Sequence, residues 1–151
     1  MPSGIYQPGI GMTGIGVSRI TLDTSELDRL TAELKPRMED AINATAFEVE
    51  GDAKIMAAVD TGAMRGSGYT STSEGSGYGS SIAEAMSRNP KALIMDEVPR
   101  NEGLSAIIAF AVNYAIYQEL GTSKMAAHPF LVPAMEQNYD KLVERIAKVF
   151  K

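Results

Sequence analysis

The sequence of 151 residues predicts an α+β fold, in which a small antiparallel sheet packs against a long kinked N-terminal helix and a long C-terminal helix. Apolar residues recur every three or four positions over residues 23–59 and again over 129–151, which indicates two amphipathic helices. Two β-prone runs, 92–98 and 104–112, flank a Pro-Arg-Asn-Glu-Gly turn composition. We therefore expect these runs to form an antiparallel hairpin.

The N-terminal residues differ in composition from the rest of the chain. Residues 1–16 hold five glycines and two prolines, which predicts a flexible arm in front of a single domain at 17–151. Residues 17–22 are rich in β-branched side chains and predict a short strand. Asp23, with Glu26 three residues later, is typical of a helix start in which side chains cap the free N–H groups.

The first long helix carries the negative charge of the chain. Residues 23–60 hold ten acidic and four basic residues, while the whole chain has a formal net charge of -5. This charge predicts a solvated helix face, or a surface directed at a basic partner or kept away from nucleic acid. Pro36 predicts a kink, because proline removes one helical hydrogen bond. The turn residues Asp60-Thr61-Gly62 end the helix.

Shorter elements are expected in the second half of the chain. Residues 66–80 consist mainly of Gly, Ser and Thr, which predicts a flexible loop, and residues 81–88 predict a short helix. Residues 113–120 predict another short helix, which Gly121 ends. The last long helix follows, and its Pro133 is tolerated only in its first turn.

Composition excludes several kinds of chemistry. The chain has no Cys, so it has no disulfide, zinc–thiolate site, iron–sulfur cluster or thiol nucleophile. Its single histidine, His128, has no evident orienting partner, and no Gly-x-Ser-x-Gly motif is present. We expect no catalytic residue, no cofactor and no metal site.

Two motif matches lack the context that their functions need. Gly9–Gly14 matches Gly-x-Gly-x-x-Gly, but no strand pattern precedes it and no helix pattern follows it. Asp96 and Glu97 follow an apolar run as in an ATPase, but the chain has no phosphate-binding loop. We interpret both matches as coincidental.

The sequence leaves three classes of function open: a structural assembly protein, a small carboxylate-dependent hydrolase and an accessory nucleic-acid-binding protein. The acidic balance and unclustered basic residues disfavour nucleic-acid binding, and the lack of a nucleophile motif disfavours the hydrolase. The longest apolar run, residues 106–112, is too short to cross a bilayer, so no membrane partner is expected. The N-terminus has no secretory signal pattern, which favours synthesis in a cytoplasm.

Two stretches, 59–65 and 112–135, are the most distinctive of the chain. The second predicts a tightly specified corner, in which a Tyr-bearing helical turn breaks at Gly121 and a Thr-Ser-Lys loop leads to Pro129. We expect residues 60–65 and 117–130 to lie close together and to support contacts between subunits or with partners.

These stretches resemble a family of small tail components of long-tailed bacteriophages. The family pattern is a Val-Asp-Thr-Gly turn and an Arg, followed later by Tyr-Ala, Tyr, an acidic residue, an aromatic residue or Leu, Gly-Thr, Met, Pro-Phe and Pro-Ala. The matching positions here are Val59, Asp60, Thr61, Gly62, Arg65, Tyr114, Ala115, Tyr117, Glu119, Leu120, Gly121, Thr122, Met125, Pro129, Phe130, Pro133 and Ala134.

The resemblance implies a non-enzymatic neck or tail-completion protein of the virion, assembled in the bacterial cytoplasm. Such proteins form a ring, commonly six-fold, that caps the tail tube and joins it to the head connector. Expected partners are other copies of the chain, tail-tube proteins and head-connector proteins, with DNA at most passing through the ring. The suspected interface residues are Asp60, Thr61, Gly62, Arg65, Tyr114, Tyr117, Glu119, Gly121, Thr122, Ser123, Lys124, Met125, His128, Pro129, Phe130 and Pro133.

Overall fold

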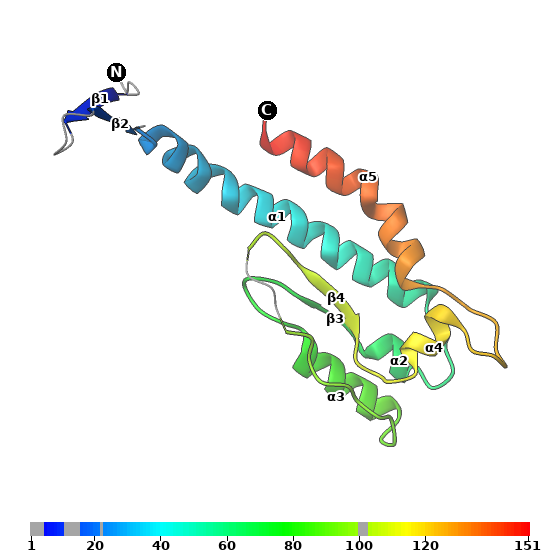
Figure 1. Ribbon diagram of the computed structural model, residues 1–151. Coiled ribbons are helices and arrows are strands. Elements are labelled where there is room, and N and C mark those ends of the chain that lie inside the picture. The colour runs from blue at the N-terminus through cyan, green and yellow to red at the C-terminus, as the bar shows by residue number, and fades with distance from the viewer. Residues whose placement is uncertain (1–4, 11–15, 22, 100–102) are drawn as a thin grey trace. The chain divides into compact units, whose positions relative to one another are not determined.

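The computed structural model describes residues 5–10, 16–21, 23–99 and 103–151 (Figure 1). It confirms the α+β class, with long helices near both ends of the chain and two-stranded antiparallel sheets. Within the described ranges, every helix falls short of the length or apolarity that a bilayer crossing requires. The chain divides into two compact units, Met1–Pro36 and Arg37–Lys151, which are treated separately below.

The first unit contains a β-hairpin. Strand β1 (Ile5–Ile10) pairs antiparallel with β2 (Gly16–Thr21), so that Ile5 lies opposite Thr21. The strand predicted at 17–22 is therefore confirmed as β2, and its partner β1 forms within residues 1–16, where the sequence predicts a flexible arm. Cross-strand pairing satisfies the backbone groups of β1 despite its Pro and Gly content. The rest of the predicted arm, 1–4 and 11–15, lies outside the described residues.

Helix α1 (Ser25–Met56) begins where the capping pattern predicts and belongs to both units. The Asp23 carboxylate accepts a hydrogen bond from the Ser25 backbone N–H at 3.0 Å, which satisfies one of the free donors at the helix start. The helix continues through Pro36. The boundary between the two units lies within α1, at Pro36–Arg37.

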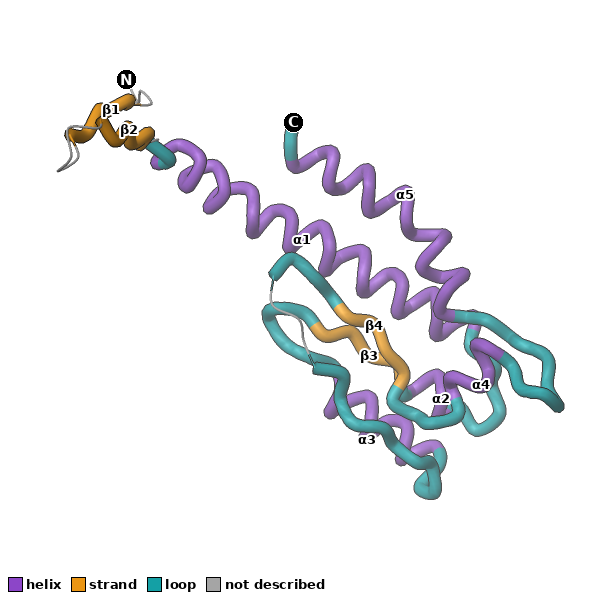
Figure 2. Tube along the Cα trace, viewed as in Figure 1, coloured by secondary structure: helices purple, strands orange, loops and turns teal. Residues whose placement is uncertain are grey.

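The second unit is built around the sheet of β3 (Gly68–Ser71) and β4 (Ile107–Phe110), which pair antiparallel. Helix α1 and helix α3 (Tyr78–Arg88) lie on opposite sides of this sheet (Figure 2). Thr70 donates a hydrogen bond to Glu50 of α1 at 2.6 Å, and Ser81 of α3 donates to the Gly68 carbonyl at 2.7 Å. Polar contacts thus anchor the sheet to both helices.

The prediction of a flexible loop over 66–80 is wrong where β3 forms. This strand is buried along its whole length, and Tyr69 is 1% exposed. A Cβ atom on Gly68 would lie 2.8 Å from Lys54 Cε and 2.9 Å from Phe110 Cε1. The small residues that suggested a loop therefore serve close packing. The predicted short helix is confirmed as α3, which begins three residues earlier than expected, at Tyr78.

The predicted hairpin between 92–98 and 104–112 forms only in part. Strand β4 pairs with β3, and the segment around Ile94 contacts the chain beyond β4 through one antiparallel bridge to Val112. The Met95 N–H donates to the Ala111 carbonyl at 2.6 Å, which supports this bridge. The β-prone pattern therefore predicted correctly that the two segments lie next to each other. It did not predict that β3 is the main partner of β4.

The hydrophobic core of the second unit consists mainly of small residues. It joins α1, α2 (Ala63–Gly66), α3, α4 (Ala115–Leu120) and α5 (Leu131–Val149). The buried cluster comprises Val49, Ala53, Ala57, Met64, Ala85, Val112, Ala115, Phe130 and Ala134. Alanine lets the elements approach closely, but each alanine buries little apolar area. The core therefore supplies less hydrophobic stabilisation than one built from large side chains.

Helices α1 and α5 lie side by side, joined by polar contacts (Figure 1). The fully buried Asn138 donates to an Asp52 carboxylate oxygen at 2.7 Å and to the Ala134 carbonyl at 2.9 Å, and it accepts from Lys141 Nζ at 3.0 Å. Nearby, Arg145 pairs with Glu48 and lowers the pKa of that carboxyl. This network fixes how the two helices face each other.

We predict that Asn138→Ala destabilises the second unit by about 1–3 kcal/mol, because it leaves buried partners without their hydrogen bonds. The free energy of unfolding from urea titration measures this loss. Gln137→Ala, at the exposed neighbouring position, is the control and should change stability by less than about 0.5 kcal/mol. Equal effects of the two substitutions would contradict the role of the network.

Candidate functional site

The corner between α4 and α5 begins at Gly121, which ends α4 as predicted. Gly121 has a φ of 74°, and its N–H donates to the Tyr117 carbonyl at 2.9 Å. A Cβ atom here would lie 2.7 Å from the Ala127 nitrogen and 2.9 Å from the Met125 oxygen. Glycine is therefore required for two reasons, the left-handed conformation and the close approach of the returning chain.

The loop after Gly121 is held by its own backbone. Thr122 and Met125 exchange two backbone hydrogen bonds, at 2.8 and 3.3 Å, and the Lys124 N–H donates to Thr122 Oγ1 at 3.2 Å. The His128 N–H donates a hydrogen bond to the Gln118 carbonyl at 2.7 Å, which ties the end of the loop to α4. The tip is thus ordered, while its exposed side chains are Thr122, Ser123, Lys124, His128 and Pro129.

The Glu119 carboxylate connects α4 to the start of α5. Its oxygens accept hydrogen bonds from the backbone N–H groups of Phe130, Leu131 and Val132, at 2.8, 3.0 and 3.0 Å. Burial alone would raise the pKa of Glu119, but these three donors outweigh burial and hold the pKa below its ordinary value. A carboxylate eleven residues back in the chain therefore caps α5.

Phe130 anchors the same corner in the core. It is 2% exposed, and its ring packs edge-to-face on Phe110 of β4 with the ring centroids 4.8 Å apart. Pro133 is the third residue of α5, which confirms its predicted place in the first turn. The direction in which α5 leaves the corner is thus fixed by both packing and capping.

The turn at 60–62 lies beside α4. Gly62 has a φ of 85°, and Thr61 Oγ1 accepts a hydrogen bond from the Ala63 N–H at 3.2 Å. A pocket of about 270 Å³ is lined by this turn, Tyr114 and Gln118, among other residues. Burial raises the pKa of the Tyr114 hydroxyl, and the negative charge of Asp60 raises it further. The two distinctive stretches therefore meet here.

Other suspected interface residues lie apart from this pocket. The Arg65 guanidinium donates to the carbonyl oxygens of Ile55 and Ala57, at 3.4 and 3.5 Å, and so caps the end of α1. Tyr117 is 53% exposed on α4. The loop tip at 122–124 and His128 do not line the pocket.

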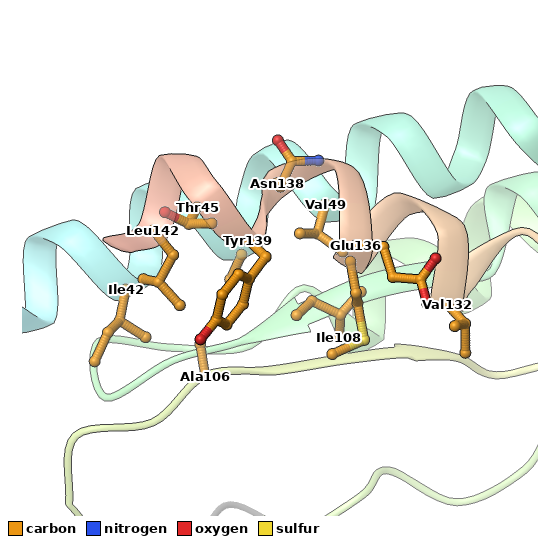
Figure 3. Close-up of a pocket in the computed structure, with 12 residues that line it drawn as sticks. Ile42, Thr45, Val49, Ala106, Ile108, Val132, Glu136, Asn138, Tyr139 and Leu142 are labelled. Carbon is orange, nitrogen blue, oxygen red and sulfur yellow. The ribbon is translucent and has the colours of Figure 1, made fainter. Parts of the chain in front are cut away.

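Sequence reasoning missed an apolar groove of about 460 Å³ between α1, β4 and α5 (Figure 3). Ile42 and Leu142 lie at one end of it, and Val132 and Glu136 lie at the other. Met135 and Tyr139 belong to the apolar repeat that predicts an amphipathic helix over residues 129–151. They are 51% and 64% exposed along the groove. A periodic stripe alone does not tell whether its partner belongs to the same chain.

Comparison of the chain with models of protein families, with curated proteins and with solved structures gave no match. In the described ranges, no three acidic or histidine side chains gather as metal ligands would. The geometry of the site is that of a corner whose polar groups are largely used in capping and turn formation. Its accessible features are apolar helix faces and an exposed loop tip.

We predict that Gly121→Ala lowers the free energy of unfolding by about 3 kcal/mol or more, because left-handed strain of about 1–2 kcal/mol adds to a backbone clash. Chemical denaturation measures this loss. Gly103→Ala is the matched control, since Gly103 also has a positive φ, and no atom of the residues that the structure describes lies within 4 Å of its Cβ position. The control should cost the strain alone, and equal losses would rule out the clash.

We predict that Glu119→Ala costs about 1.5–3 kcal/mol at neutral pH, because three backbone donors lose a charged acceptor. The folded-state pKa is depressed, so this stabilisation is present above the unfolded pKa of about 4.3 and is lost as the pH falls through the folded pKa. Unfolding measured from pH 7 to pH 3 should therefore show the difference from wild type shrinking in acid.

The control for this pH series is Glu136→Ala, which removes an exposed glutamate from the first half of α5. It should leave stability within about 0.5 kcal/mol of wild type. A Glu119→Ala penalty that stays constant down to pH 3 would contradict the capping role of the carboxylate.

Proposed function

We propose that this chain is a non-enzymatic structural subunit of the neck or tail of a long-tailed bacteriophage, which acts through protein–protein contacts in a ring, commonly six-fold. The resemblance of residues 59–65 and 112–135 to small phage tail components supports the phage setting. The proposed partners are other copies of the chain, tail-tube proteins and head-connector proteins.

The observation that carries this proposal is the amount of apolar surface left exposed. Among the residues that the structure describes, nineteen large hydrophobic side chains are more than a third exposed, whereas only six are buried in the core. Single exposed apolar residues are normal, but contiguous patches indicate interaction sites. Partner subunits would cover such patches on assembly.

Many of these exposed side chains lie on helices. On α4, Ile116, Tyr117 and Leu120 are 57%, 53% and 71% exposed at spacings of three and four residues. They adjoin the corner that Gly121 and Glu119 hold in place, so the apolar face is presented on a rigid support. A rigid support lowers the entropic cost of forming an interface.

The charge of the chain also supports the proposal. A ring through which DNA passes must not hold the phosphate backbone, and a net charge of -5 gives no broad attraction for it. Residues 23–60 carry most of this negative charge and provide a candidate face toward the channel.

We predict that a phage whose gene for this chain is inactivated produces full heads beside unjoined or overlong tails. Electron microscopy of the lysate measures this outcome, and expression of the wild-type chain should restore joined particles. Leu120→Asp should fail to restore them while keeping a normal unfolding temperature, because it places a charge in an exposed apolar face.

Gln137→Asp, at an exposed polar position of α5, is the matched control and should restore joined particles. Normal joined particles in the absence of the chain would contradict the proposed function. Full rescue by Leu120→Asp would contradict the assignment of the α4 face to an interface.

A further inference from the structure

The apolar groove described above is a preformed site that the described residues of its own unit, 37–99 and 103–151, leave open. Along its α5 side runs an exposed stripe of Val132, Met135, Tyr139 and Val143, which we call the α5 stripe and of which the first three line the groove. These side chains are 51%, 51%, 64% and 49% exposed. Facing them, the groove is lined by the buried Val49 of α1 and by the half-buried Ile108 of β4.

The start of α1 presents a second apolar surface that lacks a partner. Every residue from 25 to 33 is exposed, and Leu27 and Leu30 are 63% and 44% exposed. With Leu34 they form one helix face, which we call the α1 stripe. Helices in proteins are stabilised mainly by packing of an apolar face, so this exposed face is a candidate contact surface.

The two stripes match in spacing. The α1 stripe advances by three and then four residues, as do Val132, Met135 and Tyr139. Each trio therefore spans about 10 Å along its helix, and side chains at this repeat interdigitate when two helices pack. An apolar helix face in an apolar groove is a recurrent mode of recognition.

We infer that the α1 stripe of one copy docks into the groove of a second copy, so that successive subunits are linked head to tail. This inference rests on the proposed function and identifies the partner of the groove. The α1 stripe and the groove occur in every copy of the chain, so one docking mode repeated from copy to copy gives the head-to-tail contact that a ring requires. A second copy is therefore the source of the helix.

The apolar area of the two stripes is large enough for a specific interface between copies. Six of the seven side chains in the two stripes are about half exposed, and each presents on the order of 200 Å² when fully exposed, so their exposed halves amount to roughly 600 Å². A standard interface of about 1,600 Å² is about 57% apolar, or roughly 900 Å². The two stripes thus supply most of the apolar contact that a specific interface between copies needs.

Disulfide cross-linking tests this contact directly, because the chain has no native Cys. Leu30→Cys and Met135→Cys are made in separate, differently tagged copies of the full chain, which are mixed under mild oxidation. The mixed dimer should form about tenfold faster than with Ala32→Cys in place of Leu30→Cys, because proximity raises the effective concentration of the thiols. Ala32 is exposed on the opposite face of the helix.

Equal rates for Leu30→Cys and Ala32→Cys would overturn the inference. A chain carrying both Leu30→Cys and Met135→Cys that closes an internal disulfide as a monomer would also overturn it, since the groove would then receive its own helix. Met135→Asp separates this inference from the proposed function. If Met135→Asp blocks particle joining while the Leu30→Cys and Met135→Cys copies form no mixed dimer, the groove binds another protein and the proposed function stands.

Discussion

The direction of α5, on which the groove and the contacts between α1 and α5 depend, is fixed by the hydrogen bonds of the Glu119 carboxylate. By accepting three backbone hydrogen bonds at the start of α5, it ties that helix to α4 and fixes the direction in which α5 leaves the corner. Gly121 makes this geometry possible, because only a glycine allows the loop to return so closely. Once α5 is directed along α1, Asn138 and Arg145 can reach their partners there, and one side of the groove is formed.

The core explains why so much apolar surface remains outside. Five of its nine buried residues are alanine, so the elements approach closely but remove little apolar area from water. Large side chains such as Tyr139 and Leu120 are instead exposed on helix faces. In the proposed ring, further burial on assembly would therefore add substantially to the stability of each subunit and would couple folding to assembly.

Much of the fold could be predicted because its signals are local. The start of α1 at Asp23, the end of α4 at Gly121 and the place of Pro133 each follow from the chemistry of a single residue. The strand β3 could not be predicted, since Gly68 and Ser71 are buried through tertiary packing that overrides their loop-like composition. The partner of β4 was missed for the same reason.

Only part of the candidate site could be predicted from the sequence. Residues 60–65 and 117–130 were expected to lie close together, and the pocket confirms this for residues 60–62 and Gln118. No sequence pattern indicated the capping role of Glu119 or the groove along α5. A carboxylate that caps a helix eleven residues away leaves no periodic pattern, and a helix stripe has the same spacing whether its partner is internal or external.

The central claim is that assembly covers apolar faces which the free subunit exposes. Hydrogen–deuterium exchange with mass spectrometry, comparing the free protein with the same chain in purified tails, tests it most directly. The account predicts new protection in residues 25–34 and along the first half of α5, with little change in β3, which is already buried. Unchanged exchange in both helical segments would contradict it.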